Sequence, residues 1–306
     1  MIPFIRLIRI KNLAVITISM IGVAYFLHLK NPYEVIDFNS FHYGLLIAST
    51  LLIAAAGHVI NDYFDLKADR INKPQSIVLS RHISKRWAIL VNWIFNGLAL
   101  AVAAYLSWYY QNLVFVVVHL ISINLLWFYS AYWKRKLLLG NVVLAALPCL
   151  VLFLSSWFMQ VLNESVLPFS PYHAITWSTY LDYRFIYFVG ICAFFIILSK
   201  EIIKDIKDIP GDTIIDANTI PRKIGLNKAQ LLSLLILQLP GLLFILLSLF
   251  TDFQLPSFYA KLTLGGLQIL FILSMVTHWI APKIILKTIH WIADFALLLG
   301  LSCLFF

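Results

Sequence analysis

Nine stretches of mostly apolar residues follow one another along the chain, separated by short polar segments. A helix needs about 20 such residues to cross the hydrocarbon core of a bilayer. The pattern therefore predicts an all-α, multi-pass bundle of nine transmembrane helices that forms a single domain over residues 1–306. The expected spans are roughly residues 13–29, 41–60, 87–108, 112–130, 141–162, 185–203, 228–250, 260–281 and 285–306.

Composition and charge agree with a membrane protein. Of the 306 residues, 61% are hydrophobic and 12% are charged, and a soluble domain of this size cannot hide that much apolar surface. With the N-terminus inside, 20 of the 23 Lys and Arg residues lie on the inner side, and only Lys30, Arg184 and Lys261 do not. This bias and anionic lipid explain the net charge of +9, so no nucleic-acid partner is expected. We expect an integral protein of the cell or inner membrane, with its N-terminus and polar site cytoplasmic.

A cluster of carboxylates and one amide stands directly after the second apolar stretch. Asn61, Asp65 and Asp69 are spaced at i, i+4 and i+8, so a helix places them on one side, with Asp62 next to them. Like charges repel there unless a cation binds, and Mg²⁺ prefers such oxygens together with substrate phosphates. A solvated loop is the simpler interpretation, but the helical spacing favours a metal and diphosphate site.

A second acidic cluster follows the sixth apolar stretch. Asp205, Asp208 and Asp212 stand at i, i+3 and i+7, again on one helical face. Pro210 has no N–H, so we expect the helix to end near Ile209 and to leave Asp212 on the following turn. Both clusters fall on the cytoplasmic side, and facing one another they would form a site for two metal ions.

A tyrosine and a run of cations end the fourth apolar stretch on the same side. Tyr129, Lys134 and Arg135 fit an aromatic belt followed by positive-inside anchors, which is what composition alone favours. The alternative is that Lys134 or Arg135 binds phosphate. His58, one turn before the first cluster, is interpreted as packing.

With these motifs in view, the chain resembles the UbiA superfamily of intramembrane prenyltransferases over essentially its whole length. The acidic motif from Asn61 to Asp69 and the one from Asp205 to Asp212 carry the resemblance. Within the superfamily, the motifs are most similar to those of the geranylgeranylglyceryl phosphate geranylgeranyltransferases, which make the second ether bond of an ether-lipid precursor. The resemblance implies helices around a central cavity, in which a prenyl diphosphate meets a lipophilic acceptor.

The resemblance also implies roles for individual residues. Asp65, Asp69, Asp208 and Asp212 would be the catalytic carboxylates. The Mg²⁺ ligands or their close neighbours would be Asn61, Asp62, Asp65, Asp69, Asp205, Asp208 and Asp212. Substrate contacts would come from Asn61, Lys73, Arg81, Tyr129, Lys134 and Arg135. Because Gln75-Ser76 stands where many relatives have Arg-Pro, the cation that holds the diphosphate stays open.

Three functions remain at this point. The first is transfer of a prenyl group, expected to be geranylgeranyl, to the hydroxyl of geranylgeranylglyceryl phosphate. The second is transfer to an aromatic ring such as 4-hydroxybenzoate or another quinone or pigment precursor, because both reactions use the same ionisation site. The third is a cation-coupled transporter, since carboxylates inside the membrane also occur there. Transporter sites usually lie near the midplane, whereas these clusters lie at span ends.

Overall fold

The computed structural model describes residues 2–29, 39–72, 74–75, 77–166, 177–251, 253–280 and 282–305. Within these ranges the chain is helical, without a strand and with one isolated bridge between Leu79 and Ile83. The helices are α1 (Ile2–Leu7), α2 (Ile10–Leu29), α3 (Ser40–Asn72), α4 (Lys85–Tyr109), α5 (Val114–Ala131), a 3₁₀ turn (Trp133–Arg135), α6 (Leu139–Val166), α7 (Trp177–Ile214), α8 (Ile220–Ile224), α9 (Leu226–Phe250), α10 (Phe258–Ile280) and α11 (Pro282–Ser302).

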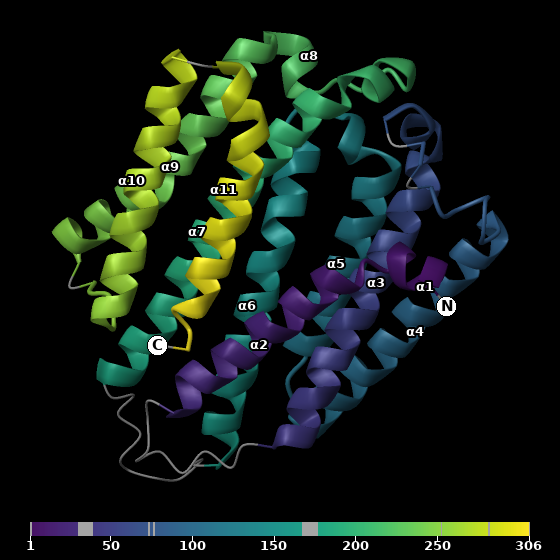
Figure 1. Cartoon of the computed structure of the whole chain (residues 1–306). Helices are drawn as coiled ribbons and strands as arrows, with labels where there is room; N and C mark the ends of the chain where they lie inside the picture. Colours follow the sequence, from purple (N-terminus) through teal and green to yellow (C-terminus); the bar gives the residue numbers. More distant parts are fainter. Residues whose placement is uncertain are drawn as a thin grey trace.

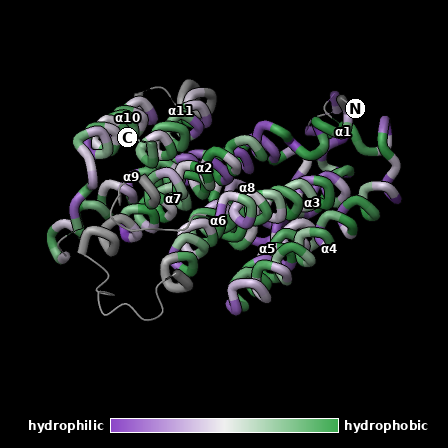
Figure 2. The backbone as a smooth tube through the Cα atoms, turned by 90° about the horizontal axis from the view of Figure 1, so that it is seen from below, coloured by the Kyte–Doolittle hydropathy of each residue, from purple (hydrophilic) through white to green (hydrophobic). Residues whose placement is uncertain are grey.

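The expected spans coincide with the long helices. In the described part of the chain, α2 to α7, α9 and α10 make eight helices that are long and apolar enough to cross a membrane. The ninth expected span falls on α11, in which the apolar stretch Thr288–Ser302 is shorter. Many large apolar side chains point outward, among them Phe250, Trp279 and Trp291. Such a surface suits lipid rather than water, and the tube of α3 and α4 is hydrophobic over most of its length (Figure 2).

Two helices extend well beyond their apolar stretches and carry the acidic clusters. α3 has 33 residues and α7 has 38. At 1.5 Å per residue they are about 50 and 57 Å long, against about 30 Å of hydrocarbon core. Both end on the upper side of the bundle in Figure 1, where α5 also ends, and α2 crosses the bundle obliquely in front of them. The acidic clusters therefore lie at one end of the molecule.

The expected end of α7 near Ile209 is wrong, because the helix continues through Pro210 to Ile214. Asp212 therefore lies on the helix and not on a following turn. The side chain of Asn72, at the end of α3, explains the continuation. Its Nδ2 donates to the Asp208 carbonyl at 3.1 Å, and its Oδ1 accepts the Gly211 N–H at 2.9 Å. These bonds satisfy backbone groups near the proline and join the two helix ends.

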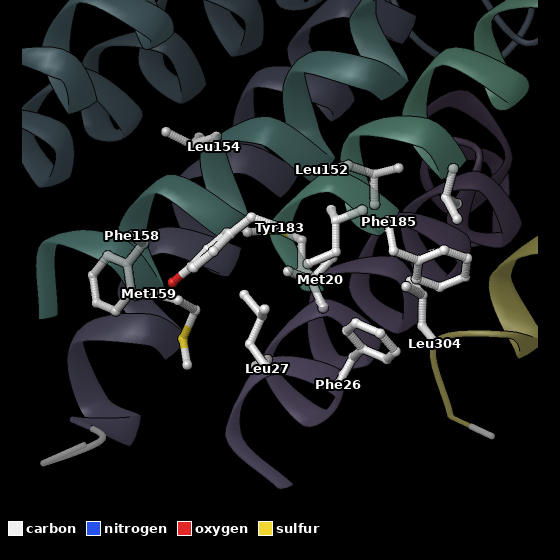
Figure 3. Packing of buried hydrophobic residues seen from close by; sticks show 14 of the residues in the cluster. Met20, Phe26, Leu27, Leu152, Leu154, Phe158, Met159, Tyr183, Phe185 and Leu304 are labelled. Carbon is white, nitrogen blue, oxygen red and sulfur yellow. The ribbon is translucent and has the colours of Figure 1, made fainter. Parts of the chain in front are cut away.

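The largest apolar core lies at the opposite end of the bundle. Met20 of α2, Phe158 of α6, Phe185 of α7 and Leu304 after α11 are almost completely buried there (Figure 3). A smaller cluster at the acidic end packs Leu79 of the α3–α4 connection against α1, α3 and α4. The first core holds the helices together below the site, and the second fixes the loop that covers it.

Candidate active site

A polar cavity of about 610 Å³ lies between the acidic ends of α3 and α7. It receives carboxylates from both helices, and cations from the N-terminal segment, from the α5–α6 connection and from α7. Residues 77–79 of the α3–α4 connection form part of its wall. The predicted site residues that line it are Asn61, Asp62, Asp65, Asp69, Lys134 and Asp208. The structure thus brings Asp65 and Asp69 of the first cluster and Asp208 of the second into one cavity.

Asp65 is the most closely held carboxylate of this cavity. It is buried, accepts a 2.7 Å hydrogen bond from Asn61 Nδ2, and forms an ion pair with the Lys134 ammonium. Burial disfavours the charge on Lys134, but the Asp65 carboxylate, together with Tyr129 and Asp69, outweighs burial and raises the pKa of Lys134 above its ordinary 10.5. Lys134 is thus a permanent cation at the centre of the site.

Asp62 points to the N-terminal segment. Arg9 Nη2 donates to Asp62 Oδ1 at 2.8 Å, and Arg9 has a φ of 53°, which reflects the sharp break between α1 and α2. The guanidinium carries further donors that this carboxylate does not use. Arg9 therefore brings a second cation, besides Lys134, to the cavity wall.

Asp205 and Asp212 lie on α7 but do not line the polar cavity. Asp205 accepts a 2.8 Å hydrogen bond from Asn141 of α6. Asp212 is buried, and its Oδ2 has no hydrogen-bond partner among the described residues. The structure thus brings Asp208 to the first cluster directly and leaves Asp205 and Asp212 on its margin.

The other residues predicted to contact substrate do not line the polar cavity in the described part of the chain. Arg81 and Arg135 are exposed and line neither the polar cavity nor the apolar one described below. Tyr129 is buried and lines the apolar cavity. Lys73 lies outside the described residues, so its predicted contact with phosphate stays a prediction.

An apolar cavity of about 670 Å³ continues from the polar one into the bundle. Arg9, Asn61 and Lys204 line both cavities, so they mark where the two meet. The apolar cavity is walled mostly by Leu, Ile, Val, Phe and Ala side chains of α2, α3, α5, α6, α7 and α9 to α11. A molecule with an anionic head and a long apolar tail fits this pair of cavities, since each part finds matching chemistry.

The donor set at the acidic ends of α3 and α7 suits a hard cation. Within the described ranges, no three His, Cys, Asp or Glu side chains lie close enough to hold a metal ion, and the Lys134 ammonium contacts Asp65. Yet Asn61 Oδ1 and Asp212 Oδ2 are buried without a hydrogen-bond partner there. A buried polar atom without a partner is costly. These oxygens, together with the neighbouring carboxylates, therefore fit a divalent cation that arrives with an anionic ligand.

Four residues that build the site were not expected to do so. Arg9 and Lys204 line both cavities, while Asn72 and Asn141 hold α7 through hydrogen bonds. Asn72 follows Asp69 of the first acidic motif by three residues, so its position in the sequence could have indicated a place near the site. Nothing in the spacing of Arg9, Asn141 or Lys204 distinguishes them from membrane anchors or packing residues.

Gly211 gives the first test of how the helix ends are joined. A Cβ at this position would lie 2.7 Å from Asn72 Cγ, so Gly211→Ala must displace the amide and break both of its hydrogen bonds. We expect a lower thermal unfolding midpoint and slower transfer, since two lost bonds outweigh the gain in helix propensity of about 1 kcal/mol. Gly97→Ala is the matched control, because its Cβ would meet nothing within 4 Å. Equal unfolding midpoints for the two variants would contradict this role.

Comparison with known proteins identifies the family. The UbiA prenyltransferase family model matches residues 18–293. Digeranylgeranylglyceryl phosphate synthase of Methanothermobacter thermautotrophicus is 27% identical over 83% of this chain and 79% of its own. The synthase of that name from Methanothrix thermoacetophila is 31% identical, over 69% of each chain.

Solved structures agree on the fold. One, from work on digeranylgeranylglyceryl phosphate synthase in membranes, aligns with a TM-score of 0.62 and 23% identity, covering 99% of this chain and 97% of the other. A UbiA homolog from Archaeoglobus fulgidus bound to GPP and Mg²⁺ aligns with a TM-score of 0.59 and 16% identity, covering 99% and 100%. The family match spans most of the chain, both acidic helices included, and the chain is a prenyltransferase of the UbiA family.

Proposed function

We propose that the protein transfers a geranylgeranyl group from its diphosphate to the hydroxyl of geranylgeranylglyceryl phosphate. The observation that carries this proposal is the junction of a carboxylate- and cation-lined cavity with an apolar one. The curated relatives, between 26% and 31% identical, bear the name of a synthase for this reaction, which supports the acceptor. The enzyme class argues against the transporter alternative, and the aromatic acceptor remains as the second candidate.

The chain's own residues suit ionisation of a prenyl diphosphate. Lys134, Arg9 and Lys204 surround the place for the headgroup and would stabilise the negative charge that grows on the leaving diphosphate. The isoprenoid tail would occupy the apolar cavity. Its apolar walls keep water from the allylic cation until the acceptor arrives.

We propose Mg²⁺ as the cofactor. Asn61, Asp65 and Asp69 of α3 would hold it on one side and Asp208 and Asp212 of α7 on the other, with Asp62 and Asp205 beside them. When bound, Mg²⁺ supplies a Lewis acid that neutralises the leaving diphosphate. The buried oxygens without partners support this assignment, since they need a ligand. Arg81, Tyr129 and Arg135 remain candidate substrate contacts.

We further propose that α11 crosses the membrane as the ninth span and that residues 1–306 form one domain. The inner location of 20 of the 23 Lys and Arg residues supports nine spans with the N-terminus inside. The alignment of 99% of the chain with one solved structure supports a single domain. The polar cavity would then open to the cytoplasm, where soluble Mg²⁺ and pyrophosphate exchange.

An acceptor comparison tests the proposed function. Protein in nanodiscs is given labelled geranylgeranyl diphosphate and either geranylgeranylglyceryl phosphate or 4-hydroxybenzoate, with Mg²⁺ or EDTA. We expect label in the ether lipid, only with Mg²⁺. Label in the aromatic acid alone would retain the family chemistry and replace the acceptor.

A further inference from the structure

Two charged residues from different helices meet in the wall of the apolar cavity. The Lys200 ammonium of α7 donates to Oδ1 of Asp294 on α11, and both residues line the cavity. His290, one turn before Asp294, places Nε2 3.9 Å from the second carboxylate oxygen, Oδ2. That distance is too long for a hydrogen bond. One oxygen of Asp294 is therefore fixed by Lys200, and the other can accept a proton donor.

The Lys200–Asp294 pair lies on the same side of α7 as the headgroup site, about two turns before it. Lys200 precedes Asp208 by eight residues, which is about 12 Å of helix axis at 1.5 Å per residue. Lys204 lies midway and lines both cavities. A polar stripe on α7 thus leads from the carboxylates of the headgroup site down to the Lys200–Asp294 pair. The first carbon of a prenyl group bound beyond its diphosphate would lie between these two levels.

A purely structural role explains this pair poorly. Ionisable residues within a membrane are costly and usually mark a substrate path. A pair that serves only stability can be replaced by apolar residues with little loss. Moreover, 43% of the Asp294 side chain is exposed, against 15% for Glu201, which Lys204 holds at 2.8 Å. Of these two carboxylates in the cavity wall, Asp294 is the more open to a bound molecule.

We propose that Asp294 binds the alcohol group of the acceptor and takes its proton, with Lys200 holding the carboxylate in place. This inference rests on the proposed function, since it requires a hydroxyl acceptor. The bond between the prenyl carbon and the diphosphate oxygen breaks, and its electron pair leaves with the diphosphate. A lone pair of the acceptor oxygen forms the new C–O bond, and the hydroxyl proton moves to Asp294.

A carboxylate paired with an ammonium is basic enough for this task. An alcohol oxygen becomes strongly acidic only as it bonds to the allylic cation, so a weak base in the right place suffices. Reacting atoms must approach to about 3–3.5 Å, which places the hydroxyl just below the prenyl carbon. Lys200 acts here as a positioning residue, and Asp294 is the group that contacts the acceptor.

Two variants test this assignment. Asp294→Asn should lower transfer to geranylgeranylglyceryl phosphate by about 100-fold or more, the usual contribution of a positioned base. Binding of labelled geranylgeranyl diphosphate with Mg²⁺ should not change. The double variant Lys200→Gln with Asp294→Asn removes both charges and retains a pair of polar side chains between α7 and α11. It should remain as inactive as the single variant.

The outcomes separate the alternatives. Recovery of transfer in the double variant would show that the single change merely left Lys200 without a partner, and would overturn the proposal. Transfer by Asp294→Asn within about threefold of wild type would overturn it directly. Asp216→Asn is the control, because Asp216 is exposed in the turn after α7, 16 residues from Lys200. If wild-type protein transfers label only to 4-hydroxybenzoate, the proposed function fails first, before any variant is compared.

Discussion

Asp65→Asn should lower Mg²⁺-dependent prenyl transfer by at least about 100-fold, as expected when charge stabilisation of a leaving group is removed. The change keeps the size of the side chain but removes the charge that faces Lys134. It also alters the partner of the Asn61 amide, which donates to Asp65 Oδ2 at 2.7 Å. Initial rates of label transfer in nanodiscs give the measurement.

The control for this change is Asp216→Asn. That carboxylate is 96% exposed on the same side of the molecule and pairs only loosely with Arg222, at 3.4 Å. We expect it to transfer at the wild-type rate. Size-exclusion profiles and thermal unfolding show whether the Asp65 variant is folded. A folded Asp65→Asn protein with near wild-type turnover would remove this residue from the site.

Lys134→Gln should raise the KM for geranylgeranyl diphosphate and slow transfer by about 10- to 100-fold, since a hydrogen bond to a charged group contributes about 1.5–3 kcal/mol. Burial lowers the pKa of Lys134, but Asp65, Tyr129 and Asp69 together outweigh burial and raise this pKa above 10.5. A cation with a raised pKa keeps its charge below that pKa. Lys134 therefore stays protonated between about pH 6 and 9, and its titration should cause no loss of activity in this range.

Lys136→Gln is the matched control for Lys134, because Lys136 is exposed two residues further along the same connection. Kinetics at varied diphosphate concentration and varied pH distinguish the two. Wild-type KM in the Lys134 variant, or equal effects of both changes, would mean that Lys134 only anchors the α5–α6 connection to α3.

The acidic helices could be predicted from sequence because the spacing of their polar residues is local. Asn61, Asp65 and Asp69 recur every four residues, so any helix places them on one side. The expectation that both clusters lie on one side of the membrane placed Asp208 near the first cluster, and the structure brings it into the same cavity. Lys134 could only be named as one of two interpretations, since a basic residue after a span is also an ordinary anchor.

Other features depend on contacts between distant segments and left no local signal. Pro210 predicted a helix end, but the Asn72 amide from α3 supports the backbone beyond it. The pairing of Lys200 with Asp294 joins residues 94 positions apart. The spacing of polar residues along the sequence predicts which residues share one face of a helix, but not which other helix packs against that face. The cavities, formed by many helices together, could not be predicted for the same reason.

A structure of the protein with a thio-analogue of geranylgeranyl diphosphate and Mn²⁺ in place of Mg²⁺ would show directly where headgroup and metal bind, with anomalous scattering to locate the metal. We expect metal within about 2.0–2.3 Å of oxygens from both helices, Asp65 of α3 and Asp208 of α7 among them. We also expect that Lys134 moves from Asp65 to the diphosphate, and that the tail lies in the apolar cavity. Metal bound by one helix only, or a diphosphate outside the polar cavity, would contradict the proposed site.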